Sequence, residues 1–289
     1  GQTPRLAPAD KALYALRDVT GTVASIPLIT ASILSKKIAG GAETVILDVK
    51  CGSGAFMRSL PEARALAQSL EQTGALAGLK VRTAVTDMDQ PLGSAVGNAL
   101  EVKEALSVLR GETGLETTSR FRDLCLSLAG IALKTVGLGD ESTAAQALGS
   151  GAALEKAKDW FAAQGADLGV FDSNNWSLAP SRAELVAKRT GYVRRVDARR
   201  VGEAALSLGA GRPTKGAAID PRVGVNSFVC VGDHVQAGGP LFEVHAKDDE
   251  DAQRTVARLS LAVEIVDEPM SARPCLLELE TNPGPSTGA

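Results

Sequence analysis

The 289-residue sequence predicts an α/β protein in which a mostly parallel sheet flanked by helices is followed by a smaller α+β domain. Two observations carry this prediction. Between residues 43 and 110 the pattern runs strand, helix, strand, helix, and this order implies parallel pairing with right-handed crossovers. From residue 187 onward, short alternating runs and glycine-rich turns replace the long helical periods, which indicates a separate unit with more β-structure.

Two helices are predicted before the first strand. The first begins near Pro8, after a loop. For the second, Ser25 is a suitable N-cap and Pro27 falls in the first turn, while Gly40 and Gly41 close the far end. The apolar residues between these signals predict that one side of this short helix is buried.

Two buried strands form the predicted centre of the sheet. Residues 43–49 are a continuous apolar run rich in β-branched side chains, and residues 80–88 form the second strand. A helix is predicted after each strand, the later one over residues 98–110. Because ligands bind beyond the carboxyl ends of parallel strands, we expect a site at the loops of residues 50–57 and 86–93.

The chain divides into four predicted segments. Residues 1–165 form the α/β domain, and the pattern of residues 119–165 is helical. Residues 166–186 are largely polar and turn-rich, and we interpret them as a linker. Residues 187–270 form the C-terminal α+β domain. Residues 271–289 end in a Pro-, Gly- and Ser-rich run, and we predict a flexible tail.

One run of the C-terminal domain has a specific β pattern. The sequence VGVNSFVCVGDHVQAGGPLFEVHA alternates and contains GDxVxxGxPL, which resembles the turn-and-strand unit of barrel-sandwich modules such as lipoyl or biotinyl carriers. A carrier needs an exposed lysine at a hairpin tip, and this run has no MKM or DKA tripeptide. The sequence therefore favours a structural, barrel-sandwich-like β unit over a carrier.

Composition and charge limit the class of protein. A net charge of −3 argues against nucleic-acid binding through phosphate neutralisation. No apolar run approaches the length of a membrane helix, so no membrane association is expected. With two histidines in the chain, a His-rich metal site or a His-based triad is not expected. The four cysteines form no CxxC pair, so we expect reduced thiols and a cytoplasmic location.

Arg17, Ser32 and Lys36 are the candidate site residues. Ser32 and Lys36 are four positions apart, so they project from one helix face, one turn separated. A chain entering this helix could bring Arg17 to the same place. A guanidinium, a hydroxyl and an ammonium would suit a flat neutral ligand rimmed with carbonyl and N–H groups. The pattern alone leaves a second interpretation open, in which Lys36 is only the solvated cationic end of the helix.

Three blocks of the sequence resemble a known family. They are GQTPRLAPADKALYALRDVTGTVASIPLITASILSKK, ILDVKCGSGAFM and TDMDQPLGSAVGNALEVKEAL. In this order they resemble the thymidine and pyrimidine-nucleoside phosphorylases, and the similarity continues more weakly to about residue 265. The resemblance implies that Arg17, Ser32 and Lys36 bind the pyrimidine base. It also implies that Arg17 and Lys36 are catalytic, because they would stabilise the departing base anion.

The resemblance implies phosphorolysis in pyrimidine salvage, a pentosyl transfer. Thymidine, and in the broad branch uridine and deoxyuridine, would react with phosphate to give the free base and (deoxy)ribose 1-phosphate. The partners would be the small-molecule nucleoside and phosphate as co-substrate, with no organic cofactor. In the pyrimidine-nucleoside branch a monovalent cation, K⁺, is held partly by two main-chain carbonyls and a glutamate. The matching positions are Leu92, Ala95 and Glu104.

The resemblance also concerns what lies outside this sequence. In that family an N-terminal part with a Gly/Ser/Thr-rich phosphate-binding segment precedes the matched region. The sequence starts with Gly and contains no GxGxxG, Walker or Lys-His-Ser pattern. We therefore expect a chain that lacks its N-terminal portion, keeps the base-binding half and is inactive alone. The full-length protein is expected to be a homodimer, as family members are.

Two other classes stay open at this point. A phosphoribosyltransferase-like enzyme would need a pyrophosphate and metal site, and no acidic metal-binding pair is evident. A non-catalytic pyrimidine-binding protein would keep the fold without turnover. For Asp48 and Lys50 two interpretations are also open, because they either orient the site or form an internal ion pair. Cys51 is interpreted as a small buried hydrophobe rather than a reactive thiol.

Overall fold

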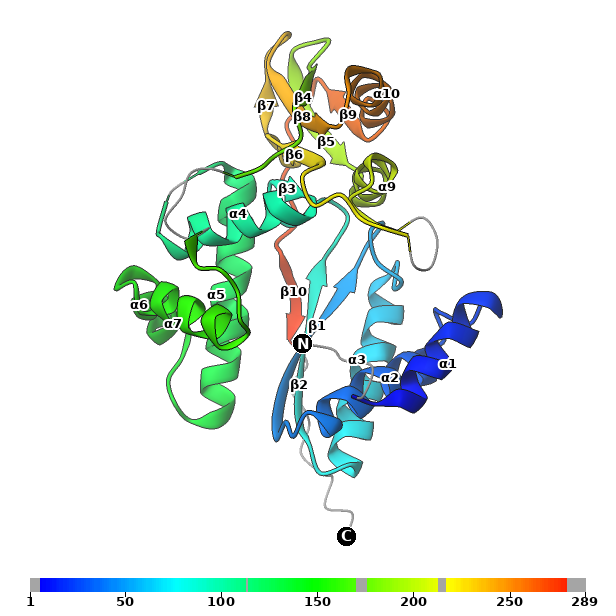
Figure 1. Ribbon diagram of the computed structural model, residues 1–289, viewed down its shortest axis with the longest axis vertical. Helices are drawn as coiled ribbons and strands as arrows, with labels where there is room; N and C mark the ends of the chain where they lie inside the picture. Colours follow the sequence, from blue (N-terminus) through cyan, green and yellow to red (C-terminus); the bar gives the residue numbers. More distant parts are fainter. Residues whose placement is uncertain (1–5, 113, 170–175, 213–216, 280–289) are drawn as a thin grey trace.

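The computed structural model describes residues 6–112, 114–169, 176–212 and 217–279. Figure 1 shows two units, one above the other. The lower unit has a central sheet between two groups of helices. Its described helices are α1 (Pro8–Val19), α2 (Ile26–Ala39), α3 (Leu60–Leu76), α4 (Asn98–Leu109), α5 (Glu116–Val136), α6 (Glu141–Gly149) and α7 (Ala152–Ala163). The strands of its sheet are β1 (Thr44–Cys51), β2 (Lys80–Asp87) and β10 (Leu276–Leu279).

β1 and β2 are parallel and in register from Thr44↔Lys80 to Cys51↔Asp87. α3 connects them and begins with a capping box between Ser59 and Glu62. α3 lies so close to β2 that a Cβ on Gly74 would be 2.3 Å from the side chain of Val81. These two strands, with α2 and α3, enclose an apolar core that includes Leu34, Val49, Leu66, Leu70 and Val85.

The upper unit is β-rich, and two of the described helices belong to it. Its core is formed by both of its sheets together with the helices, which are amphipathic. Its strands are β4 (Ser181–Val186), β5 (Gly191–Val196), β6 (Gly224–Ser227), β7 (His234–Val235), β8 (Pro240–Ala246) and β9 (Val263–Val266), and its helices are α9 (Ala198–Leu208) and α10 (Asp249–Leu259). All described pairings of these strands are antiparallel, with strand orders β3-β6-β8-β4 and β7-β5-β9, where β3 (Ala95–Val96) comes from the α/β part of the chain.

Two pairings connect the units in ways that sequence order does not suggest. The short strand β3 (Ala95–Val96), from the α/β part of the chain, pairs with β6 of the upper unit. β10 returns in the opposite direction and pairs antiparallel with β2. The strands β1, β2 and β10 thus make one parallel and one antiparallel pairing. The α/β class is confirmed, whereas the mostly parallel sheet and the barrel-sandwich-like detail stay predictions.

β10 corrects one predicted segment. The flexible tail over residues 271–289 is wrong for residues 276–279, because Leu276 pairs with Thr86 and Leu277 packs on the α2–α3 core. A strand here covers an edge of β2 that would otherwise expose unpaired backbone groups. Residues 280–289 of the predicted tail lie outside the described residues.

The predicted linker over residues 166–186 is also partly wrong. Residues 181–186 form β4, because they alternate buried and exposed side chains and pair with β8. Residues 170–175 lie outside the described residues. The division of the chain into domains stays a prediction.

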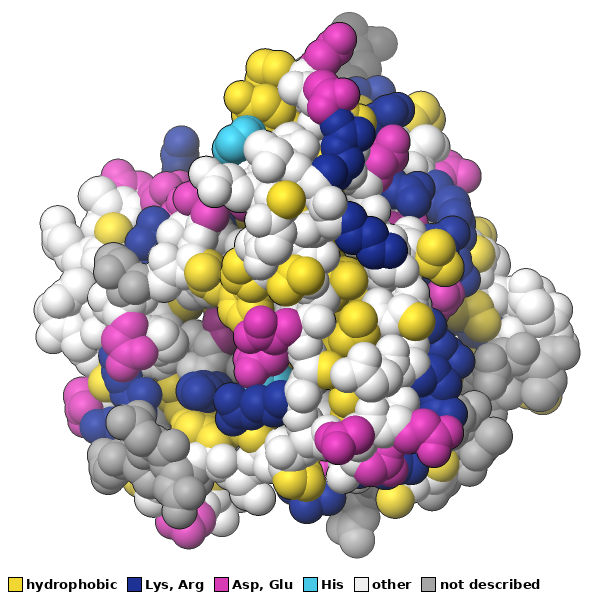
Figure 2. Space-filling model, turned by 90° about the horizontal axis from the view of Figure 1, so that it is seen from above, with side chains coloured by type: hydrophobic (Ala, Val, Ile, Leu, Met, Phe, Trp, Pro, Cys, Tyr) yellow, Lys and Arg dark blue, Asp and Glu magenta, His cyan; other side chains and the backbone are white. Residues whose placement is uncertain are grey.

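The surface of the upper unit carries mixed charge. Seen from above, basic and acidic side chains are interspersed rather than gathered by sign (Figure 2). Ion pairs account for part of this pattern, including Arg194–Glu264 at 3.2 Å and Arg199–Glu203 at 3.0 Å. None of the described helices is long and apolar enough to cross a bilayer. All four cysteines are free thiols, and Cys51 is buried as its sequence context indicated.

Candidate functional site

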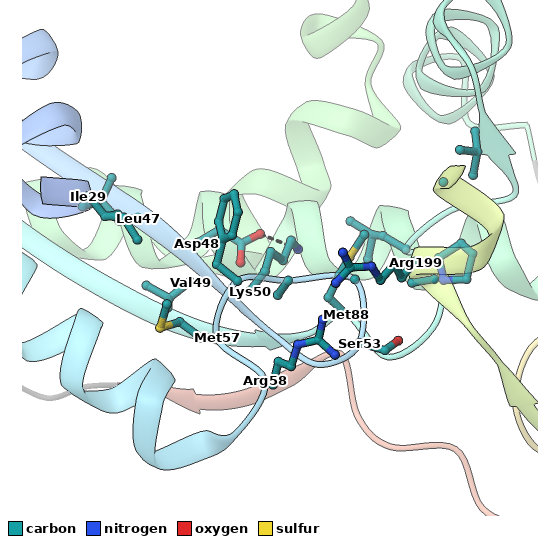
Figure 3. A pocket seen from close by; sticks show the side chains of 18 of the residues that line it. Ile29, Leu47, Asp48, Val49, Lys50, Ser53, Met57, Arg58, Met88 and Arg199 are labelled. Atoms are coloured by element: carbon teal, nitrogen blue, oxygen red, sulfur yellow. Dashed lines mark ion pairs between the residues drawn. The ribbon is translucent and has the colours of Figure 1, made fainter. Parts of the chain in front are cut away.

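A cleft of about 1370 Å³ lies at the carboxyl ends of β1 and β2. It extends from α1 and α2 to the first turns of α9, so both units contribute to its wall. Figure 3 shows Ile29 of α2 on one side of this space and Arg58, Ser53 and Arg199 on the other. The position agrees with the general location of ligand sites in open α/β sheets.

All three predicted base-binding residues line this cleft. The Nζ of Lys36 lies 2.6 Å from the Oγ of Ser32, as their four-residue spacing predicts. The same Nζ donates to Oδ2 of Asp10 at 2.7 Å. Ser32 is 8% exposed, and α2 holds it one turn from Lys36. The ammonium is therefore not a freely solvated helix end, although its charge already has a partner.

Asp10 is a member of this group that the sequence did not reveal. Burial raises the pKa of its carboxyl, but hydrogen bonds from Lys36 and Ser32 and the charges of Lys36 and Arg17 outweigh burial and lower the pKa below its usual value. Asp10 is therefore ionised at neutral pH and fixes the direction of the Lys36 side chain. Its sequence signal, an acid in the first turn of a helix, is also expected from the helix dipole alone.

Arg17 is held by the turn that joins α1 to α2. One guanidinium nitrogen donates to the carbonyl of Leu28 at 3.3 Å and another to the carbonyl of Val23. The guanidinium carbon lies 5.4 Å from the centre of the Tyr14 ring, a cation–π distance. Arg17 is 6% exposed, and its Nε has no hydrogen-bond partner among the described residues. The side chain is thus a rigid, desolvated donor at the cleft.

Asp48 and Lys50 form an ion pair at 2.7 Å, and both line the cleft (Figure 3). They are two residues apart on β1, so they project from the same face of the strand. Asp48 also accepts a hydrogen bond from Thr86 on β2. Asp48 and Lys50 therefore form an ion pair within the cleft wall. The two interpretations that the sequence left open, an internal ion pair or residues that orient the site, do not exclude each other.

The predicted cation ligands Leu92, Ala95 and Glu104 come together at the cleft wall. Oε1 of Glu104 accepts from the amide and the hydroxyl of Ser94, both at 2.7 Å, and from the Thr118 hydroxyl at 2.8 Å. Among the described residues, Oε2 accepts a hydrogen bond from the amide of Ala95 alone, at 3.0 Å. Oε2 alone thus keeps acceptor capacity for a cation, together with main-chain carbonyls. The K⁺ site stays a prediction; no cluster of three or more His, Cys, Asp or Glu suited to a metal occurs among the described residues.

Three further cleft residues had no clear sequence signal. Phe56 is 64% exposed and lies among polar side chains of the cleft. Arg58 follows the glycine-rich loop, and Arg199 lies in the first turn of α9, where it pairs with Glu203. Exposed arginines are common on any surface, so their meeting at one cleft became visible only in the folded chain.

Comparison with known proteins identifies the relatives of this chain. Residues 1–156 match the family described as "Glycosyl transferase family, a/b domain", and residues 192–266 match "Pyrimidine nucleoside phosphorylase C-terminal domain". Proteins named pyrimidine-nucleoside phosphorylase from Staphylococcus aureus strains USA300, NCTC 8325 and bovine RF122 are each 43% identical to it over 274 residues. The alignments cover 94% of this chain and 63% of each relative, so the chain spans less than two thirds of their length. The chain belongs to the pyrimidine-nucleoside phosphorylase family of glycosyl transferases.

Proposed function

We propose that the cleft binds the pyrimidine base of a nucleoside and that the protein is a pentosyltransferase that cleaves this nucleoside with phosphate. The observation that carries the proposal is the meeting of Arg17, Ser32 and Lys36 on one cleft wall, within a family whose named relatives are pyrimidine-nucleoside phosphorylases. Thymidine is the first candidate substrate, followed by uridine and deoxyuridine. The products are the free base and the pentose 1-phosphate, as pyrimidine salvage requires.

The chemistry follows from the charge that develops when the glycosidic bond breaks. The C1′–N1 bond cleaves, phosphate bonds to C1′, and the bonding electrons remain on the base, which leaves as an anion. In the proposed complex, Arg17 and Lys36, which both line the cleft, are the two positive groups that interact with the carbonyl oxygens of this anion. Donors fixed before the reaction stabilise such charge by several kcal/mol when water is excluded. Ser32 would hydrogen-bond a ring carbonyl or N–H, and Asp10 keeps Lys36 aimed.

Several parts of the proposal rest on the family rather than on the cleft. Phosphate is the co-substrate, no organic cofactor is required, and K⁺ would bind through Oε2 of Glu104 with the carbonyls of Leu92 and Ala95. A homodimer and a cytoplasmic location belong to the same proposal. Since this sequence has no phosphate-cradling motif, we expect the 289-residue polypeptide tested alone to bind the base but to turn over little or no nucleoside.

Base binding and turnover are tested separately. Isothermal titration of the polypeptide with thymine and uracil should give saturable binding that Lys36→Met weakens at least about tenfold. Lys37→Met should leave the binding unchanged, because Lys37 is exposed on the same helix. Thymidine is then incubated with and without phosphate, and free base is measured. Binding without turnover supports the base site. Unchanged binding in Lys36→Met contradicts it. If free base is instead consumed with a pyrophosphorylated ribose, to give a nucleotide and pyrophosphate, and no base is released with phosphate, the result favours the phosphoribosyltransferase class.

A further inference from the structure

The segment before β10 does not line the cleft, but through Arg273 it contacts Asp89, which bonds two residues of the cleft wall. The Arg273 guanidinium lies 2.5 Å from Oδ2 of Asp89 and 3.6 Å from Oδ1 of Asp87. Asp89 is the second residue after the end of β2, and Arg273 lies 184 positions later in the chain. The contact therefore joins two distant parts of the sequence beside the loop that contains Ser53.

Asp89 forms hydrogen bonds with residues of two walls of the cleft, the loop that contains Ser53 and the start of α9. Its Oδ1 accepts the amide of Ser53 at 2.8 Å, and its main-chain carbonyl accepts the Ser53 hydroxyl at 3.0 Å. The same carbonyl accepts the amide of Ala198, the first residue of α9, at 3.0 Å. Packing here is tight, since a Cβ on Gly52 would lie 2.6 Å from the nitrogen of Asp89. Both Ser53 and Ala198 line the cleft.

Arg273 is itself anchored. The guanidinium of Arg120, on α5, donates to the carbonyl of Arg273 at 3.1 Å. Two residues after Arg273, the carbonyl of Cys275 accepts a hydrogen bond from the amide of Asp87 at 2.8 Å. Asp87 is 1% exposed, and Arg273 with Arg120 supplies the positive charge that this carboxylate and Asp89 need. The main chain of this segment is thus fixed by hydrogen bonds at Arg273 and Cys275, and this positions the Arg273 guanidinium beside Asp89.

We propose that Arg273 is a positioning residue: acting through Asp89, it fixes the Ser53 loop and the start of α9, and so shapes the part of the cleft that receives the sugar side of the substrate. Figure 3 supports the assignment of ends, since Ser53 and Arg199 lie across the cleft from Ile29 of α2, the helix that carries Lys36. A pyrimidine held at α2 would direct its N1 substituent toward Ser53 and α9. The identity of the ligand rests on the proposed function, whereas the role of Arg273 in ordering the loop does not.

The test compares Arg273→Ala with Arg273→Lys and with Glu278→Gln. Glu278 lies on β10 and pairs with Arg64 of α3, so its variant perturbs β10 without touching Asp89. Hydrogen–deuterium exchange followed by NMR should show the Ser53 amide exchanging at least about tenfold faster in Arg273→Ala, since its acceptor is no longer held. Arg273→Lys should recover part of the protection, and Glu278→Gln should leave Ser53 unchanged.

Binding provides the second readout. In Arg273→Ala the affinity for thymidine should fall about tenfold, while the affinity for thymine changes less than about twofold, because only the sugar side of the cleft is disturbed. Unchanged Ser53 exchange overturns the positioning role. Equal losses for thymine and thymidine, in step with a lower Tm, overturn it in favour of a purely structural role. If neither ligand binds the unmodified chain, the proposed function fails, and the exchange comparison still decides the role of Arg273.

Discussion

Replacing Lys36 by methionine removes an ammonium and keeps a side chain of similar shape. In the folded chain this ammonium lies 2.7 Å from the Asp10 carboxylate and 2.6 Å from the Ser32 hydroxyl. The Asp10 side chain is 10% exposed, so water replaces the lost partner only in part. A hydrogen bond between charged groups contributes roughly 1.5–3 kcal/mol, and partial exposure reduces it, so we expect Lys36→Met to lower the free energy of unfolding by about 1–2 kcal/mol.

A double-mutant cycle isolates this contact. Asp10→Asn in the Lys36→Met background removes the unpaired carboxylate, so the double variant should regain at least about half of the lost stability. Unfolding in urea, followed by circular dichroism, gives the four free energies, and Lys37→Met is the matched control. Thymine affinity should be at least about tenfold lower in both Lys36 variants. If the single and double variants are equally unstable, or if Lys36→Met binds thymine normally, the reasoning about this ammonium is refuted.

Three further outcomes are expected. Gly52→Ala should lower Tm by more than Gly78→Ala, since both glycines have positive φ but only Gly52 lacks room for a Cβ; equal shifts in differential scanning calorimetry would show that the close approach is unimportant. Burial raises the pKa of Asp10, but its hydrogen bonds outweigh burial, so the folded-state pKa lies below the ordinary value of about 3.9. The contribution of ionised Asp10 to stability is therefore complete above the ordinary value and is lost as pH falls through the lower folded-state value. The stability difference between the unmodified chain and Asp10→Asn should therefore shrink in acid, and a difference that grows would contradict the ion pair. Burial raises the pKa of Cys230 to about 12, so maleimide at about pH 8 should label the exposed Cys125 first, as peptide mass mapping would show.

The sequence predicted best those features that depend on neighbours in the chain. The bounds of α2 follow from Ser25, Pro27 and Gly40, and the structure begins and ends this helix accordingly, although Ser25 makes no side-chain capping bond. β1 and β2 follow from apolar runs of the length that a buried strand needs. The grouping of Ser32 with Lys36 follows from helix geometry. Arg17 was added because the chain entering this helix could bring it to the same place, and the resemblance to a family supported that addition.

Features that depend on distant partners were missed for a physical reason. β10 is four residues long and follows a proline-containing segment, so no periodicity distinguishes it from a loop. Its partner β2 lies far away in the chain, and only the uncovered edge of that strand makes pairing favourable. Arg273 likewise resembles any exposed arginine until the fold brings it to Asp89.

The two ends of the cleft therefore differ in how they are assembled. The proposed base end consists of Asp10, Arg17, Ser32 and Lys36, which α1, α2 and their connecting turn bring together. The hydrogen bond between the hydroxyls of Thr30 and Ser69, at 2.9 Å, fixes α2 on α3. The other end requires β2, α9 and the segment before β10 to meet. Loosening the C-terminal segment should consequently reduce recognition of the sugar before recognition of the base. On the proposed function, discrimination between nucleoside and free base should thus depend on the long-range contacts of the fold, whereas pyrimidine recognition should depend on two adjacent helices.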